Sequence, residues 1–201
     1  MKILWLATNN FHKQDDMKQL LQGKYEVKTL CDLPKPQITD IAETGSSFAE
    51  NALIKARFLS NLIQGPAIGD DSGLEIDALN NFPGIYSARW INTRDGYQLA
   101  NASILEKMVN ITNRNAQYIC VLAYVDVTKG IEKLFTGVLQ GTIATSSKGT
   151  YGFGYDPIFY LPLYRKTCGE ITRTMKNKIS HRYQALQKLL KWLESEQQNE
   201  L

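Results

Sequence analysis

The longest uninterrupted apolar run in this chain is Tyr118–Val125 (YICVLAYV), which is eight residues long. A membrane-spanning helix needs about 20 apolar residues, so we expect no membrane partner. The run instead predicts a strand over residues 118–127, with an antiparallel partner strand over 131–145. With 43% hydrophobic and 21% charged residues, the 201-residue chain has the composition of a globular protein, which excludes disorder, collagen and coiled coil.

Strand-like and helix-like segments alternate over the first half of the chain, and hairpins follow them. Helices are expected over residues 13–21, 47–63, 97–109 and 181–195. Further strands are expected over residues 2–8, 25–30, 66–69 and 74–79, and Pro34 and Pro36 mark a loop. This order predicts one domain over residues 1–201 of the α/β class, with a mixed twisted sheet and flanking helices.

The three cysteines, Cys31, Cys120 and Cys168, are widely spaced and form no CxxC motif. With only two histidines in addition, the chain lacks a zinc-finger pattern. The apolar segment Ile3–Ala7 is too short for the core of a signal peptide. We therefore expect reduced thiols in a cytoplasmic protein.

Charge is balanced overall, at 23 Lys+Arg against 20 Asp+Glu, but it is unevenly distributed. Residues 165–191 hold eight basic side chains and one acid, whereas residues 40–77 hold seven acids and two basic side chains. An acidic and a basic segment in one domain suit a metal-bound anion such as a nucleoside phosphate. Two solvated faces that never meet would give the same counts.

Several common catalytic motifs are missing. The chain has no GxxxxGK[ST] phosphate loop, no HExxH and no GxSxG. The sequence Gly152–Pro157 begins like a dinucleotide fingerprint but has proline in place of the third glycine. A metalloprotease and an α/β-hydrolase are therefore disfavoured.

Two segments at expected helix starts carry candidate binding residues. Thr8–Lys13 (TNNFHK) follows the first strand, where open backbone N–H groups and Lys13 suit an anion, although Asn and Thr are also ordinary helix caps. In the second segment, Ser47 and Glu50 form a capping box, and Glu43 lies in the loop before it. Lys55 lies on the expected helix and is either a ligand-binding group or a solvated side chain.

Two further segments suit metal and base binding. Asp70 and Asp71 are expected directly after a strand, a position where carboxylates bind Mg²⁺ together with substrate phosphates, although such a sequence can also be a plain turn. Glycines flank Phe153 and leave its ring open for a base to stack on, a contact worth roughly 1–3 kcal/mol. Lys176, His181 and Arg182 could donate hydrogen bonds to the base, or form a basic helix start.

Six motifs in order resemble the inosine triphosphate pyrophosphatase family: TNNFHK, ETGSSFAENALIKAR, GDDSGLEIDAL, FPGIYSARW, GTYGFGYDPIF and KNKISHRYQAL. They run from Thr8 to Leu186, nearly the whole chain. The resemblance implies hydrolysis of ITP, dITP and XTP to the monophosphate and pyrophosphate with Mg²⁺. It also implies a homodimer of elongated two-lobed subunits with a central cleft, and no nucleic-acid partner.

The same resemblance implies a role for each matching residue. Glu43 and Asp71 would hold Mg²⁺, and Asp71 would accept the proton of the attacking water. Substrate would contact Thr8, Asn9, Asn10, Phe11, His12, Lys13, Lys55, Ser72, Phe153, Gly154, Tyr155, Asp156, Lys176, His181 and Arg182. Arg182 would meet the C6 acceptor of hypoxanthine or xanthine, whereas adenine presents an amino donor there.

The chain departs from the family pattern at four positions: Asn9, Tyr151 and Tyr183 where glycine is usual, and Gly69 where alanine is common. The two tyrosines flank the expected base pocket, so one alternative is the same chemistry with an altered base preference. A second alternative is a non-catalytic nucleotide-binding protein. A third is a nucleic-acid-binding module that uses the basic stretch 165–191, which the acidic segment disfavours.

Overall fold

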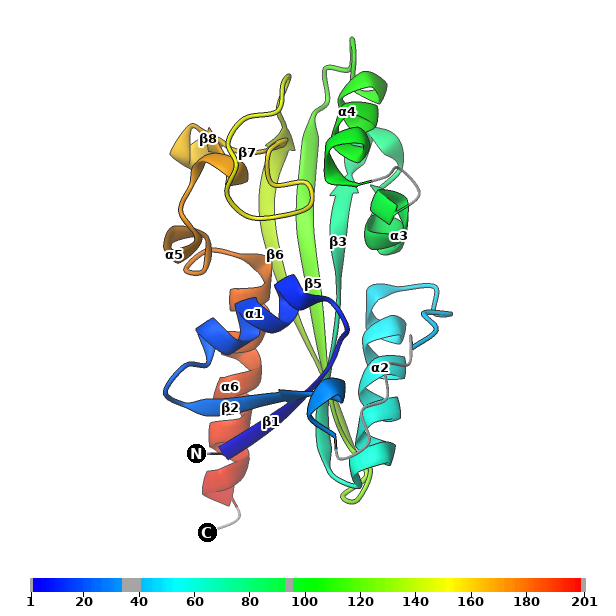
Figure 1. Ribbon diagram of the computed structural model, residues 1–201, viewed down its shortest axis with the longest axis vertical. Coiled ribbons are helices and arrows are strands. Elements are labelled where there is room, and N and C mark those ends of the chain that lie inside the picture. Colours follow the sequence, from blue (N-terminus) through cyan, green and yellow to red (C-terminus); the bar gives the residue numbers. More distant parts are fainter. Residues whose placement is uncertain (1, 34–40, 93–95, 200–201) are drawn as a thin grey trace. The chain divides into compact units, whose positions relative to one another are not determined.

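The computed structural model describes residues 2–33, 41–92 and 96–199, so the loop expected at Pro34 and Pro36 lies outside the described residues. Figure 1 shows its helices and strands. The strands are β1 Lys2–Ala7, β2 Tyr25–Thr29, β3 Pro66–Ile76, β4 Phe82–Pro83, β5 Asn115–Asp126, β6 Ile131–Ile143, β7 Phe159–Leu161 and β8 Lys166–Thr167. The α-helices are α1 Phe11–Leu20, α2 Phe48–Ile63, α3 Ser87–Asn92, α4 Tyr97–Lys107, α5 Arg173–Lys176 and α6 His181–Asn199.

The strands form one mixed sheet with hydrogen-bonded order β2-β1-β3-β5-β6-β7-β8, and β4 pairs with β3. β1 is parallel to β2 and β3, whereas β7 is antiparallel to β6 and β8. β5 and β6 are neighbours joined by a short turn, and Ile143 N donates to Arg114 O at 2.8 Å across their far ends. This contact makes the pair antiparallel, as expected, and the predicted mixed α/β sheet is confirmed.

The described chain divides into two compact units. The first contains residues 1–71, 120–137 and 182–201, and the second contains residues 72–119 and 138–181. β3, β5 and β6 each contribute residues to both units. The prediction of one domain with a cleft between lobes stays a prediction.

In the first unit, helices pack on both faces of the strands. Leu4 and Leu6 of β1 share a buried cluster with residues of α1 and α6, including Met17 and Leu186. Ala7 belongs to a separate buried cluster with Leu59 of α2. Because successive strand side chains point to opposite faces, α1 and α6 cover one face and α2 covers the other, as Figure 1 shows.

The second unit has its own core. Leu74 and Ile76 of β3 pack with Ala100 and Ile104 of α4, and the fully buried ring of Phe159 belongs to the same cluster. Tyr118 of β5 stacks on Phe159 with ring centroids 4.2 Å apart. This core supports the loop between β6 and β7, which carries Phe153.

Two expectations about element bounds are wrong. The strands expected over 66–69 and 74–79 are one continuous strand, β3, and residues 77–79 form a 3-10 turn. Adjacent acids and Ser-Gly resemble a turn in sequence, but Asp70 and Asp71 are buried inside the strand with basic partners. The first helix begins at Phe11 rather than residue 13, because the side chain of Asn10 caps it.

The structure also bears on the expected absence of a membrane helix and on the state of the cysteines. In the described part of the chain, no helix has the length and apolar character needed to cross a bilayer. The three cysteines are free thiols, with Cys31 exposed and Cys120 and Cys168 buried. Burial raises the pKa of Cys168 to about 12, so this thiol stays protonated at neutral pH.

Gly69 allows α2 to pack directly on β3. A Cβ atom at this position would lie 2.0 Å from the carbonyl oxygen of Ala52, a backbone atom of α2. We expect Gly69→Ala to lower the free energy of unfolding by about 1–3 kcal/mol in urea denaturation, because helix and strand must separate. Gly65→Ala is the matched control, since its Cβ would meet only Ile63 O at 3.9 Å. Equal stability of the two variants would contradict this packing.

Candidate active site

The first cluster of the site, the carboxylate–lysine cluster, consists of Glu43, Lys55 and Asp71. Lys55 lies two turns into α2, and its Nζ donates to Glu43 Oε1 and Asp71 Oδ1, both at 2.8 Å. Asn51, one turn earlier, donates to Asp71 Oδ2 at 3.3 Å. Asn51 also accepts a hydrogen bond from Gly45 N at 2.8 Å, which ties the loop that carries Glu43 to the helix.

Burial determines the electrostatics of this cluster. Lys55 is 5% exposed and Asp71 is 4% exposed. Of the two interpretations of Lys55 from the sequence, a solvated side chain is therefore excluded. Burial raises the pKa of Asp71, and the charges of Lys55 and Lys13 only partly offset this. Burial would lower the pKa of Lys55, but Asp71 and Glu43 reverse that effect and raise it. Lys55 is therefore a stable cation beside a carboxylate with raised basicity.

A second group of charges in the same unit surrounds Asp70. Its carboxylate is fully buried and contacts Lys13 Nζ at 2.6 Å and Arg182 Nε at 2.8 Å. Arg182 also donates to Asp16 at 2.9 Å. Burial alone would raise the pKa of Asp70, but Arg182 and Lys13 outweigh it and hold that pKa well below its usual range. Asp70 thus holds Lys13 and Arg182 in place.

The start of α1 uses part of the expected binding segment for its own cap. The side chain of Asn10 accepts hydrogen bonds from His12 N at 3.0 Å and Lys13 N at 3.2 Å. Thr8 is buried, and its hydroxyl accepts from Asn10 N at 3.2 Å. Asn9, Phe11 and His12 are exposed at this helix end. The capping interpretation holds for Asn10, and the exposed residues of the segment lie where an anion could approach the helix N-terminus.

The second unit contains a separate loop cluster, defined as Phe153, Asp156, Lys176 and Tyr118. Asp156 accepts hydrogen bonds from Phe153 N at 2.9 Å, from the Tyr118 hydroxyl at 3.2 Å and from Lys176 Nζ. Lys176 Nζ lies 5.0 Å from the centre of the Phe153 ring. His181 stacks on Tyr118 with ring centroids 4.9 Å apart. Four of the residues predicted to contact the base are therefore neighbours.

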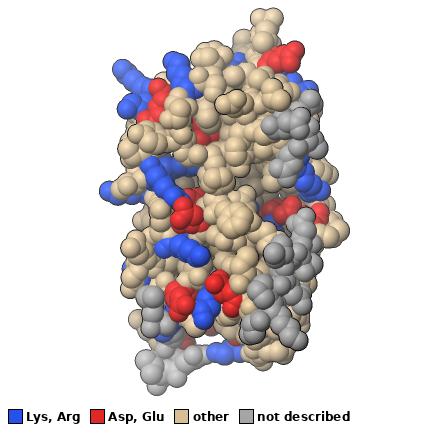
Figure 2. Space-filling model, viewed as in Figure 1, with Lys and Arg blue, Asp and Glu red and all other residues tan. Residues whose placement is uncertain are grey.

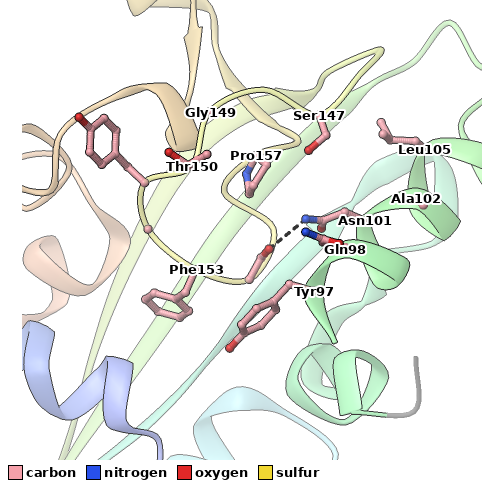
Figure 3. A pocket seen from close by; sticks show the side chains of 13 residues that line it. Tyr97, Gln98, Asn101, Ala102, Leu105, Ser147, Gly149, Thr150, Phe153 and Pro157 are labelled. Carbon is pink, nitrogen blue, oxygen red and sulfur yellow. Dashed lines mark hydrogen bonds between the residues drawn. The ribbon is translucent and has the colours of Figure 1, made fainter. Parts of the chain in front are cut away.

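Other predicted residues of this unit have different surroundings. Gly154 is buried in the loop, and Ser72 is half-buried in β3. Tyr155 is 3% exposed, and its hydroxyl donates to Ser87 O at 2.8 Å, which makes it part of the core. A cavity of about 560 Å³ lies beside the loop and is lined by Phe153, Tyr97 and the exposed Tyr151 (Figure 3).

Sequence reasoning missed residues that shape the charges around Asp70 and the loop cluster. Asp16 carried no motif signal, and its role requires the contact with Arg182, which is 166 positions away. Tyr118 was assigned only to a strand, although its hydroxyl binds Asp156. Asp70 and Asp71 were expected at the end of a strand, and this expectation is wrong because both lie inside β3.

On the face shown in Figure 2, basic and acidic side chains are interspersed.

Residues 4–192 match the profile of the Ham1 family. A dITP/XTP pyrophosphatase of Halalkalibacterium halodurans is 43% identical, covering 96% of this chain and 100% of the relative. One of Dictyoglomus thermophilum is 41% identical, covering 96% and 95%.

Solved structures agree with these relatives. The Staphylococcus aureus Ham1 protein has a TM-score of 0.86 at 39% identity, covering 97% of this chain and 100% of that chain. A HAM1 protein from Coxiella burnetii has a TM-score of 0.87 at 37% identity, with the same coverage.

The buried ion pairs of Lys55 lead to a stability prediction. We expect Lys55→Met to lower the free energy of unfolding by about 3–5 kcal/mol near pH 8, because Asp71 and Glu43 lose their shared partner. Urea denaturation measures the change. Lys24→Met, a substitution of an exposed lysine in the same unit, is the control and is expected to be neutral.

The deficit of Lys55→Met should shrink toward acid pH. Without Lys55 the folded-state pKa of Asp71 rises further above its unfolded value of about 3.9. Between the two pKa values the folded state then binds more protons than the unfolded state, so stability rises as pH falls through the folded pKa toward the unfolded one. Unfolding curves near pH 5 and pH 8 compare the two conditions, and an equal deficit at both would contradict the pairing.

Proposed function

Because the chain belongs to the Ham1 family, we propose that it hydrolyses the non-standard purine nucleotides dITP, XTP and ITP to a nucleoside monophosphate and pyrophosphate. The observation that carries the proposal is the sharing of Lys55 by Glu43 and Asp71, each at 2.8 Å. This arrangement brings together a cation that can bind a phosphate and two carboxylates that can bind a metal ion. The names of the two relatives support the substrate class.

Mg²⁺ fits the carboxylate–lysine cluster. The carboxylates of Glu43 and Asp71 both contact Lys55 Nζ, so they face the same region and are the proposed ligands of the ion. Among the described residues, no group of three or more His, Cys, Asp or Glu side chains could hold a metal. Mg²⁺ usually takes one or two carboxylates and completes its shell with water and substrate phosphates. When bound, it would neutralise charge on the triphosphate.

Phosphate binding is assigned to cations of the first unit. Lys55 is held charged by two acids, and Lys13 lies on the first turn of α1, where the helix dipole also favours an anion. Thr8, Asn9, Asn10, Phe11 and His12 surround that helix end. Approaching phosphates would compete with Asp70 for Lys13, so substrate binding would redistribute existing ion pairs.

Asp71 is the proposed proton acceptor. In the reaction, a water oxygen forms a bond to the α-phosphorus while the bond from that phosphorus to the bridging oxygen breaks, and pyrophosphate leaves. The water proton passes to an Asp71 carboxylate oxygen. The raised pKa of Asp71, caused first by burial, makes it a better acceptor than an exposed aspartate.

Base recognition is assigned to the loop cluster with Gly154, Tyr155, His181, Arg182 and Ser72. Phe153 offers a ring for stacking, and Lys176 and His181 carry donors for a C6 carbonyl oxygen. Arg182 was predicted to read the base, and its Nε and one Nη donate to Asp70 and Asp16. Base reading by Arg182 therefore stays a prediction. We also propose a homodimer that works in the cytoplasm, as the family resemblance implies.

The first experiment measures pyrophosphate release from ITP, XTP, dITP, ATP and GTP with Mg²⁺. We expect release that favours the first three, and Asp71→Asn should lower kcat about 10²–10⁴-fold because the proton acceptor is lost. Asp77→Asn, which changes an exposed acid, is the matched control. No release from any nucleotide, or full activity of Asp71→Asn, would refute the proposal. Equal rates on all five would keep the chemistry and favour an altered base preference.

The metal assignment has its own test. Glu43→Gln should raise the Mg²⁺ concentration for half-maximal activity about tenfold, because one anionic ligand becomes a neutral amide. Titration of the metal at saturating ITP measures this value. Glu106→Gln, at an exposed position on α4, should leave it unchanged. An unchanged metal requirement in Glu43→Gln would remove Glu43 from the site.

A further inference from the structure

The loop that presents Phe153 is tightly wound. Gly152 and Gly154, on either side of it, have φ angles of +76° and +65°. A Cβ on Gly152 would lie 1.9 Å from an Asp156 carboxylate oxygen, so only glycine fits there. Asp156 also accepts from Phe153 N at 2.9 Å, which fixes the backbone on the N-terminal side of the ring.

Asn101 of α4 holds the other side of the same loop. Its Nδ2 donates to the carbonyl oxygen of Gly154 at 3.1 Å, as the dashed line in Figure 3 shows. Asn101 is 4% exposed, so water competes little for this bond. The contact links two segments that are 53 positions apart and lie in the same unit.

The side-chain oxygen of Asn101, unlike the nitrogen, is unpaired in the described part of the chain. Within the described residues, Asn101 Oδ1 is buried and has no hydrogen-bond partner. A buried acceptor without a partner costs folding free energy, whereas an apolar side chain of similar size would avoid that cost. The side chain therefore costs folding free energy at Oδ1, and the contact that accounts for an asparagine here is the hydrogen bond from Nδ2 to the Gly154 carbonyl.

We infer that Asn101 is a positioning residue, which fixes the Gly154 carbonyl and thereby the orientation of the Phe153 ring toward the purine base. The inference rests on the proposed function, in which Phe153 stacks on the base. Asp156 and Asn101 hold the backbone on the two sides of Phe153, so the ring is presented before substrate arrives. Loss of either bond leaves the ring in place on average but free to tilt.

Two variants test the role by different routes. Asn101→Asp keeps the shape but places an oxygen against the Gly154 carbonyl, and Asn101→Leu removes both the donor and the unpartnered acceptor. Both should raise KM for ITP about tenfold and leave kcat within about twofold, because base stacking is weakened and the phosphate chemistry is untouched. Asn101→Leu also leaves the buried Gly154 carbonyl without its donor, so we expect its thermal midpoint to fall by about 2–8 °C. A merely structural role would lower the thermal midpoint and leave the KM for ITP unchanged.

A double-mutant cycle completes the test. In a Phe153→Ala background, Asn101→Leu should raise KM by no more than about twofold, because the ring it positions is gone. Gln22→Glu, an amide-to-acid change at an exposed position of the first unit, is the control for Asn101→Asp. The inference would be overturned, and the proposed function would not, by a wild-type KM in both Asn101 variants. The same holds if Asn101→Leu raises KM as much in the Phe153→Ala background as in the wild type. Absence of ITP hydrolysis by the wild type would refute the proposed function, and the inference would fall with it.

Discussion

Burial of two adjacent carboxylates inside β3 is the constraint on which the first unit depends. Asp70 and Asp71 are 0% and 4% exposed, and a buried charge is tolerated only with partners of opposite sign. Neighbouring residues of a strand point to opposite faces of the sheet, so each acid needs its own set of partners. Lys13 and Arg182 reach Asp70 from α1 and α6, and Lys55 reaches Asp71 from α2.

This division gives the two acids different chemistry. Asp70 faces two cations, which hold its pKa well below the usual range, so it remains an anion that positions other groups. Asp71 shares one lysine with Glu43, and burial raises its pKa. Two identical side chains next to each other thus become a permanent counter-ion and a candidate proton acceptor. The difference arises from which helix covers each face of the strand.

In the second unit the corresponding constraint is the backbone of the loop 152–156. Asp156 binds both the backbone of Phe153 and Lys176, so one carboxylate fixes a ring and a cation together. The turn of this loop was predictable from the sequence, because glycines at 152 and 154 allow left-handed backbone angles. The contact with Asn101 was not predictable, since α4 showed only the ordinary pattern of a helix.

The sequence by itself determined the local features: the cap of α2 at Ser47, the strand at Tyr118, the glycine turns and the residue types of the site. These depend on backbone geometry and side-chain chemistry over a few positions, which are written in consecutive residues. Only the tertiary structure decided that Asp70 and Asp71 lie within a strand and which cations they meet. Those partners are up to 112 positions apart, and packing of helices on both faces of the sheet, rather than any local preference, brings them together.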